Sequence, residues 1–367
     1  MKLFRVLLIS PVGNQKEGGI AKWTDHLMSY YKANQGNLDL KLLYNPKSRE
    51  SFGTFNIFQR IVAGLANYVP LYRVFCRETK SQHYDVVHIC TSASISLTKD
   101  LAIVRKAHRR GVKAIVHCHF GRIPEILKTN NLEGRLFGKL MKTVDRLVVM
   151  DMKSYHALQS IGYEKVSYLP NPLSPSVQKI IEDNQQVQRI NNKIVFAGHV
   201  VVGKGVFELI TACKQLPNIQ LKVIGHAPDE MVKLRLMELA GEGYASWLQL
   251  TGAIPFEDVI REMLSCSVFV LPTYSEGFPN VIIESMACGC PIVTTPVGAI
   301  PEMLNIDSEE PCGICVPVKN TEALREAVQQ MLADKGQAAK FGERARNKVY
   351  SKYAMSCVWD QLLAIWS

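Results

Sequence analysis

Short, nearly continuous apolar runs alternate along the chain with longer segments whose apolar residues recur every three or four positions. In the first half, the runs predict strands buried on both faces, and the helical spacing predicts helices between them. We expect strands at 4–9, 38–43, 85–89, 112–117, 145–149 and 165–169, and helices at 20–32, 54–79, 97–109, 134–143 and 151–160. This alternation indicates a parallel sheet covered by helices on both faces.

A polar, proline-containing segment at 170–192 interrupts the alternation and is typical of a linker. The pattern then restarts, with strands expected at 193–197, 219–224, 247–250, 267–271, 291–294 and 314–316, and helices at 204–214, 229–239, 256–264, 280–288, 320–333 and 336–350. A last helix, 354–366, carries an apolar stripe that must be buried, consisting of Trp359, Leu362, Leu363 and Trp366.

These patterns predict an α/β protein with two doubly wound, Rossmann-like domains facing each other across a cleft. We expect an N-terminal domain at 1–172 and a C-terminal domain at 190–350, with residues 351–367 packing back on the first. Neither domain carries a G-x-G-x-x-G fingerprint or a G-x-x-x-x-G-K-[ST] loop. The absence of these motifs argues against a dinucleotide-dependent redox enzyme and against an ATP hydrolase.

Charge is distributed unevenly between the two halves. Residues 1–170 hold 26 Lys and Arg against 12 Asp and Glu, a net charge of +14, whereas the remainder carries −4. The first half is therefore expected to meet something anionic, and a phospholipid surface fits better than nucleic acid, for which no motif is present. Basic residues also recur at helical spacing among apolar ones, as in Arg135, Lys139, Lys142 and Arg146. A solvated basic face is the alternative.

The chain has ten cysteines, most of them within apolar runs, where buried reduced thiols are expected. Cys312 and Cys315 have the spacing of half a zinc site, but no second half follows, so we expect no metal site. No apolar stretch reaches the roughly 18 residues of a membrane span, and no secretion signal precedes the first strand. We expect a cytoplasmic protein that associates peripherally with the inner face of the plasma membrane.

The segment with the strongest indications of chemistry is 271–290. A strand ends at Leu271, a loop carries Glu276 and Gly277, and a helix begins around Pro279 and Asn280. Proline suits the first turn of a helix and asparagine its cap, and Gly289 ends the helix. A helix opening at the carboxyl end of a strand binds phosphate through its free N–H groups. Glu276 and Glu284 flank this end, and their natural partners are sugar hydroxyls, unless they only complement the helix dipole.

A second segment, 195–210, has a strand ending at Gly198 and a helix opening near Lys204 and Gly205. A lysine is unfavourable at a helix N-terminus unless an anion binds beside it. Lys204 is therefore a candidate phosphate ligand, with a solvated surface lysine as the alternative.

Together these segments resemble the donor-binding half of the retaining glycosyltransferases of family 4 (GT-B fold, glycosyl transferases group 1). That family has a G-R-x-x-x-x-K-G loop and an E-x7-E motif; this chain has Gly198 to Gly205 and then Glu276 to Glu284. The resemblance implies that Lys204 binds the donor diphosphate, that Glu276 and the backbone of Gly277 and Phe278 meet the donor sugar, and that Glu284 holds the ribose. It places the base of the nucleotide near Ile254, and it adds Asn280 to the residues that are implied to bind the donor.

The first domain resembles the family more loosely, through a Gly18-Gly19-Ile20 loop and a strand end at Val116 to Gly121. Gly18 and Gly19 would let the backbone approach the diphosphate, with positive φ available to them. His119 is implied to lie near the transferred sugar, and with Lys204 and Glu276 it forms the expected catalytic set. The family arginine is His199 here, and because histidine is shorter and titrates near neutrality, diphosphate binding must be weaker or compensated.

The resemblance implies a hexosyltransferase that retains anomeric configuration and moves a sugar from a nucleoside-diphosphate sugar, most commonly a UDP-sugar, to a glycan or lipid-linked acceptor in surface polysaccharide biosynthesis. No D-x-D sequence is present, which favours a metal-independent reaction without a cofactor. A nucleotide-sugar epimerase of the same fold and an inactive scaffold protein are the alternatives.

Overall fold

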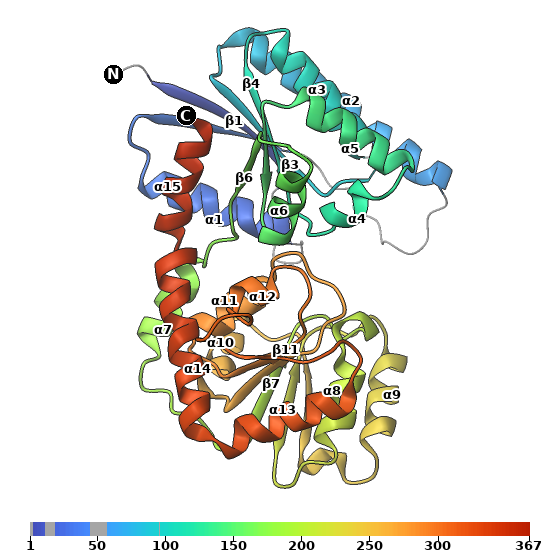
Figure 1. Cartoon of the computed structure of the whole chain (residues 1–367), viewed down its shortest axis with the longest axis vertical. Coiled ribbons are helices and arrows are strands. Elements are labelled where there is room, and N and C mark those ends of the chain that lie inside the picture. Colours follow the sequence, from blue (N-terminus) through green and yellow to red (C-terminus); the bar gives the residue numbers. More distant parts are fainter. Residues whose placement is uncertain (1–2, 12–18, 45–56, 95) are drawn as a thin grey trace. The chain divides into compact units, whose positions relative to one another are not determined.

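The computed structural model describes residues 3–11, 19–44, 57–94 and 96–367 and divides into two compact units. Unit 1 comprises Met1–Pro170 together with Trp359–Ser367, and unit 2 comprises Asn171–Val358. Each unit is a six-stranded, wholly parallel sheet with helices between successive strands, as Figure 1 shows. The predicted α/β class with two doubly wound units is confirmed.

The sheet of unit 1 has the strand order β2-β1-β3-β4-β5-β6. Its elements are β1 (Phe4–Ser10), α1 (Gly19–Ala33), β2 (Leu38–Tyr44), α2 (Ile57–Ser81), β3 (Val86–Thr91), α3 (Ser96–His108), β4 (Lys113–Cys118), α4 (Ile123–Leu127), α5 (Leu132–Thr143), β5 (Arg146–Val149), α6 (Met152–Ser160) and β6 (Val166–Tyr168). The central strands are mostly apolar because helices cover both of their faces, and β3 is buried along its whole length.

The last helix, α15 (Met355–Trp366), passes from unit 2 into unit 1. In unit 1 its indole side chains are buried: Trp366 is 1% exposed, and Trp359 packs against Tyr30 of α1 at 5.6 Å between ring centroids. Lys113 donates hydrogen bonds to the last carbonyls of the helix, those of Ile365 and Trp366, where a cation is favourable. This helix therefore buries its apolar stripe against unit 1.

The sheet of unit 2 has the order β12-β11-β10-β7-β8-β9, so the direction of winding reverses between β7 and β10. Its elements are α7 (Pro175–Asp183), β7 (Lys193–Ala197), the 3₁₀ turn η1 (Val202–Lys204), α8 (Val206–Cys213), β8 (Gln220–Ile224), α9 (Glu230–Ala240), η2 (Tyr244–Ser246), β9 (Leu248–Gly252), α10 (Phe256–Ser265), β10 (Val268–Leu271), α11 (Asn280–Ala287), β11 (Ile292–Thr294), α12 (Ile300–Met303), β12 (Ile314–Cys315), α13 (Thr321–Ala333), α14 (Lys335–Lys348) and the π-helical turn η3 (Val349–Tyr353).

The segment expected to be a linker, 170–192, contains helix α7 instead. Ser174 caps this helix through its side-chain oxygen, Pro175 occupies the first turn, and Val177 and Ile181 are buried four residues apart. Nine residues carry too short an apolar pattern to stand out beside proline and a run of polar residues, which explains the incorrect prediction.

Candidate active site

The reversal of strand order in unit 2 defines a crevice position at the carboxyl ends of β7 and β10, where doubly wound sheets bind ligands. Chain segments diverge to opposite sides of the sheet after these two neighbouring strands. Lys204 follows β7 and Glu276 follows β10, so the fold brings the two residues to this switch point although 72 residues separate them.

The loop after β7 is held tightly against the loop after β10. Gly205 has φ +71°, and a Cβ built on it would lie 2.0 Å from the carbonyl oxygen of Pro272, so only glycine fits here. The carbonyl of Gly203 accepts hydrogen bonds from the N–H of Tyr274 at 2.9 Å and the hydroxyl of Thr273 at 3.3 Å. Lys204 therefore lies in the 3₁₀ turn before α8, two residues ahead of the helix rather than inside its first turn as expected.

The ammonium group of Lys204 donates directly to Oε1 of Glu276. Both side chains are largely buried, with 25% of Lys204 and 12% of Glu276 exposed. A charge-assisted hydrogen bond with this little solvent orients both partners. The residues that the sequence assigned to the diphosphate and to the sugar thus form one ion pair.

Helix α11 follows the loop, but its N-terminus differs in detail from the prediction. Pro279 is the N-cap residue without a side-chain cap, and Asn280 is the first helical residue, so proline and asparagine exchange the expected places. Asn280 is then free to bond elsewhere, and its Oδ1 accepts from Asn171 at 3.1 Å. Glu284 lies one turn into the helix and is buried, and Gly289 ends the helix at φ +64° as predicted.

The remaining donor-site predictions concern loops. His199, which is exposed, and Ile254, which is half-buried, follow the carboxyl ends of β7 and β9, at the same edge of the sheet as Lys204. Gly18 lies outside the described residues. Gly19 is the first residue of α1 and its φ is not left-handed, so the positive φ considered for it is not adopted.

In unit 1, His119 follows β4, and its N–H still donates to Thr91 of β3, which extends the ladder by one residue. His119 consequently lies on the same face of the sheet as His117, and their rings are 4.0 Å apart between centroids. Trp23 of α1 packs edge-on against both rings at 5.1 and 5.0 Å. The half-buried His119 therefore rests on a fully buried aromatic layer.

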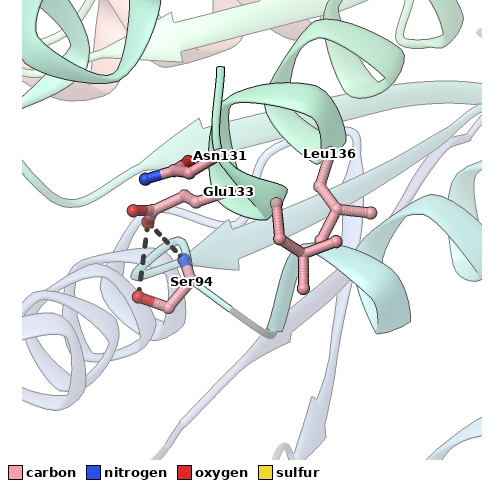
Figure 2. A pocket seen from close by; sticks show the side chains of 5 residues that line it. Ser94, Asn131, Glu133 and Leu136 are labelled. Atoms are coloured by element: carbon pink, nitrogen blue, oxygen red, sulfur yellow. Dashed lines mark hydrogen bonds between the residues drawn. The ribbon is translucent and has the colours of Figure 1, made fainter. Parts of the chain in front are cut away.

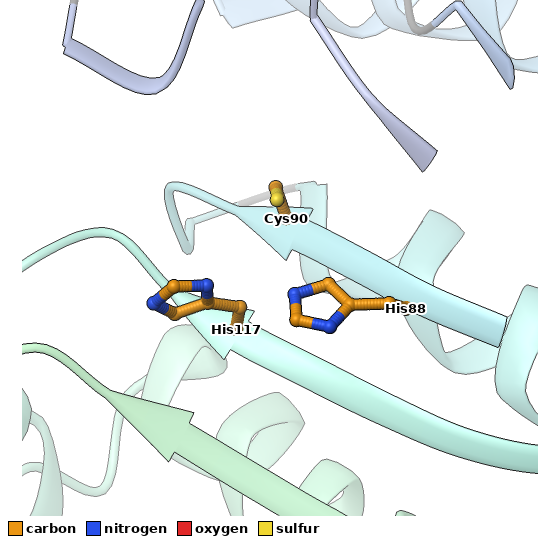
Figure 3. Close-up of side chains that lie close together, drawn as sticks. All are labelled: His88, Cys90 and His117. Atoms are coloured by element: carbon orange, nitrogen blue, oxygen red, sulfur yellow. The ribbon is translucent and has the colours of Figure 1, made fainter. Parts of the chain in front are cut away.

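Beneath His119, the buried residues His88, Cys90 and His117 have the chemistry of a metal site, and Figure 3 shows them on adjacent strands. The indole N–H of Trp366, which can only donate, bonds Nδ1 of His88 at 2.9 Å. The proton of a neutral His88 is then on Nε2, so this ring has no lone pair left for a metal. Two ligands remain, fewer than a buried site requires.

Burial keeps these imidazoles neutral. It lowers the pKa of His88 to about 3, and it lowers the pKa of His117 well below the ordinary 6.5, with a further contribution from the neighbouring His119 and His88. Neither ring nitrogen of His117 has a hydrogen-bond partner within the described residues. Buried, neutral and held by rings on several sides, His117 offers His119 a packing surface without charge.

A pocket of about 250 Å³ opens beside the carboxyl end of β3 and is lined by Ser94, Asn131, Leu132, Glu133 and Leu136 (Figure 2). Glu133 accepts from the N–H of Ser94 at 2.8 Å and from Arg122, which neutralises its charge. Ser94 has φ +62°, an unusual conformation for a serine that this carboxylate holds in place. No sequence pattern indicates this pocket, since Ser94 follows β3 and the other four residues belong to the N-cap and first turns of α5.

Two further residues that shape the site were missed. Asn171 bonds the loop at Phe278 and Asn280, and Arg189 binds the carbonyls of Cys266 at 2.6 Å and Gly289 at 2.5 Å, capping the C-terminal end of α11. Both residues stand in the segment interpreted as a linker. Polar residues in such a segment carry no pattern that separates solvated side chains from bonded ones.

Comparison with known families extends the match beyond single motifs. Residues 178–348 match the family described as glycosyl transferases group 1. Among curated relatives, the capsular polysaccharide biosynthesis glycosyltransferase CapM of Staphylococcus aureus is 25% identical over 65% of this chain and 60% of its own length. The alpha-maltose-1-phosphate synthase of Mycolicibacterium smegmatis is 31% identical over 48% of each chain. The matches thus span only about half to three fifths of these relatives.

Solved structures match over nearly the whole chain. Sucrose-phosphate synthase from Thermosynechococcus elongatus has a TM-score of 0.74 at 17% identity, covering 99% of this chain and 98% of its own. Anabaena Alr3699/HepE, solved in complex with UDP, has a TM-score of 0.72 at 16% identity and 99% coverage of both chains. At such identities the likeness concerns the fold, and it confirms the predicted GT-B fold.

Proposed function

Because residues 178–348 match the glycosyl transferases group 1 family, we propose that this protein is a retaining glycosyltransferase. It moves a hexosyl group from a nucleoside-diphosphate sugar to a glycan or lipid-linked acceptor in surface polysaccharide biosynthesis. The observation that carries the proposal is the pair of Lys204 and Glu276 at the switch point of unit 2, one cation for a diphosphate and one carboxylate for sugar hydroxyls.

The donor binds through complementary charges at this edge of the sheet. Lys204 exchanges its bond to Glu276 for the diphosphate, the N-terminal end of α11 adds its dipole, and the freed carboxylate accepts from the sugar. Glu284 holds the ribose, and the loop at Ile254 meets the base. Uracil is the proposed base, supported by the UDP and UDP-glucose complexes of the structural relative HepE.

During transfer, the bond between the anomeric carbon and the diphosphate oxygen breaks, and an acceptor hydroxyl oxygen bonds to that carbon on the same face. The hydroxyl proton passes to the departing diphosphate, whose charge Lys204 and the backbone N–H groups stabilise. These groups supply the positive charge that a metal would otherwise provide, so the reaction is metal-independent. Loss of the family arginine at position 199 leaves Lys204 as the principal cation.

Unit 1 supplies the acceptor side. His119 holds a hydroxyl of the transferred sugar, and the pocket beside Ser94 opens at the same carboxyl edge of the sheet. The names of two curated relatives support the setting: CapM of capsular polysaccharide biosynthesis, and TuaC of Bacillus subtilis, a putative teichuronic acid biosynthesis glycosyltransferase, 31% identical over 36% of this chain.

The proposed partner of unit 1 is an anionic membrane surface at the cytoplasmic face. Arg135, Lys139 and Lys142 are exposed along one side of α5, and Leu132, 67% exposed, stands on the same side one turn earlier. Glu133, the one acidic residue of the helix, is bound to Arg122. Among the described helices, none meets the length and hydrophobicity of a membrane span. The basic side of α5 and the exposed Leu132 support attachment by charge and shallow insertion.

Vesicle co-sedimentation tests this attachment. The protein should bind phosphatidylglycerol vesicles and lose that binding at high salt, whereas phosphatidylcholine vesicles should not retain it. Replacing Lys139 and Lys142 by Gln should weaken binding severalfold. The matched control replaces Lys233 and Arg235 of α9 in unit 2, and equal loss in both double variants would contradict an α5 surface.

Turnover assays test the enzyme itself. A thermal-shift screen of nucleotide sugars should first identify the donor, because a ligand of the folded state raises the melting temperature. With that donor, the purified protein should transfer sugar or slowly hydrolyse the donor, and Lys204→Ala and Glu276→Ala should each remove most turnover while leaving the fold intact. Interconversion of the nucleotide sugar without transfer would instead identify an epimerase, and stabilisation by no nucleotide sugar would favour a scaffold.

A further inference from the structure

The loop that carries Glu276, which we call the donor loop (276–280), is tied down through its carbonyl groups. The carbonyl of Gly277 accepts from the N–H of Ala299 at 2.9 Å. The carbonyl of Glu276 faces Gly298 so closely that a Cβ there would lie 2.3 Å from its oxygen. The carbonyl of Phe278 accepts from Nδ2 of Asn171 at 3.0 Å. All three acceptors are thus directed into the protein.

This arrangement fixes where the N–H groups of the loop point. In a trans peptide the C=O of one residue and the N–H of the next point in opposite directions, and the chain contains no cis peptide among its described bonds. The N–H groups of Gly277 and Phe278 therefore point away from Gly298 and Ala299. Neither donates to a backbone oxygen within the described residues. Two main-chain donors are left beside the ion pair of Glu276.

Asn171 holds this geometry from one end of unit 2. It is the first residue of the unit, only 5% exposed, and both hydrogens of its amide are used, one on the carbonyl of Phe278 and one on Oδ1 of Asn280. A single side chain thereby clamps the donor loop and the first turn of α11 together.

Tyr353, near the C-terminal end of unit 2, also contacts Phe278. Its ring packs edge-on against that of Phe278 at 5.5 Å between centroids, and its carbonyl accepts from the N–H of Leu173 at 2.6 Å. Tyr353 ends the π-helical turn η3, shortly before the chain leaves the unit after Val358. The first segment of unit 2, through Asn171, and its last segment, through Tyr353, therefore both contact Phe278.

We infer that Asn171 and Tyr353 are positioning residues for donor binding: they hold Phe278 so that the N–H groups of Gly277 and Phe278 point at the nucleotide sugar. This inference rests on the proposed function and adds residues that touch no substrate themselves. It also gives the segments at the beginning and the end of unit 2, which contain Asn171 and Tyr353, a role in shaping the donor site.

The test measures binding of UDP and UDP-glucose to the full chain by titration calorimetry. Asn171→Ala should weaken both about tenfold, the effect of losing one or two hydrogen bonds. Asn171→Asp keeps the size of the side chain but donates no hydrogen bond at neutral pH, so this variant should bind UDP and UDP-glucose no better than Asn171→Ala does. Tyr353→Leu preserves apolar burial and should weaken binding severalfold.

Asn184→Ala is the matched control. Asn184 is 7% exposed in the same unit and makes two comparable bonds, to the carbonyl of Ile180 at 2.8 Å and from Arg261 at 3.0 Å, neither to the donor loop. It should lower the melting temperature as Asn171→Ala does and leave binding unchanged. Equal affinity losses in both variants would overturn the inference, since a structural defect would then account for them.

Hydrogen exchange in the absence of ligand separates this inference from the proposed function. Asn171→Ala should accelerate exchange of the N–H groups of Ile282 and Ala299, which bond the carbonyls of Pro279 and Gly277, more than tenfold, and Asn184→Ala should not. Unchanged exchange there would refute the positioning role even if the wild-type protein binds a nucleotide sugar. Faster exchange in a protein that binds no nucleotide sugar would instead retain the positioning role and reject the glycosyltransferase.

Discussion

Because Lys204 and Glu276 bond each other, we predict that substitutions of the two residues change the affinity for a nucleoside diphosphate in opposite directions. In the ligand-free protein the ammonium is occupied by the carboxylate, so a nucleoside diphosphate must break this bond before Lys204 can reach it. Glu276→Gln removes the competing charge and leaves the lysine available. Lys204→Met removes the cation and leaves an uncompensated carboxylate beside the diphosphate.

The structure sets the size of these effects. Hydrogen bonds to charged groups contribute about 1.5–3 kcal/mol, and the pair is largely but not wholly buried, so its disruption costs about 1–2 kcal/mol. Removing that cost in Glu276→Gln should tighten binding of UDP roughly tenfold. In Lys204→Met, loss of the phosphate contact and the added repulsion together should weaken it more than about a hundredfold. Transfer of sugar should fall steeply in both variants.

Titration calorimetry with UDP, which lacks the sugar that Glu276 would hold, measures this directly. Lys222→Met is the control, because Lys222 forms a similarly exposed pair with Glu262 at 2.8 Å on the body of strand β8. Its UDP affinity should not change. Weaker UDP binding in both Glu276→Gln and Lys204→Met would refute the reasoning, because the pair would then be a structural bond rather than a competitor of the ligand.

Three other substitutions give separate tests. Gly298→Ala should lower donor affinity more than tenfold because its Cβ would displace the carbonyl of Glu276, whereas Gly243→Ala, equally left-handed at φ +72° but in open space, should cost only about 1–2 kcal/mol of stability; calorimetry and thermal melts compare them. His117 has a lowered pKa, so its neutral form stabilises the fold fully above about pH 6.5 and this contribution is lost as the pH falls; urea unfolding of His117→Gln should show a pH slope smaller by about 1.4 kcal/mol per unit below pH 6.5, and an unchanged slope would contradict a buried neutral ring. Arg189→Met should lose about 2 kcal/mol of stability in urea because it leaves carbonyls at the end of α11 without their donor, and a loss below about 0.5 kcal/mol would show that water replaces it.

The elements that the sequence predicted best are those with a local cause. Parallel strands such as β3 and β7 are buried along their whole length and mostly apolar, and the glycine that ends helix α11, Gly289, adopts the expected left-handed backbone. The position of Lys204 and Glu276 at the carboxyl edge of the sheet also followed from the pattern, since each lies in the loop after a predicted strand. Their bond to each other did not, because it depends on how two loops pack.

Predictions failed where tertiary contacts override local preference. Asn280 is a good helix cap by type, yet its side chain bonds Asn171, and Pro279 takes the cap position. Helix α7 was missed because its apolar face has only two buried residues, and it is stable through packing on α10 and α11. Asn171 and Arg189 were missed for the same reason, since a polar side chain does not reveal its partner in the sequence.

The return of helix α15 to unit 1 has a consequence for biosynthesis. Trp366 closes over His88, a residue 278 positions earlier, and Lys113 binds the same end of the helix. During synthesis the sheet of unit 1 can assemble with α1 on this face, but the side of His88 that Trp366 covers stays open until the last helix is available. Unit 2 is formed by one continuous stretch, Asn171–Val358, whereas unit 1 needs a segment made after all of unit 2, so the complete packing of unit 1 is expected to come last.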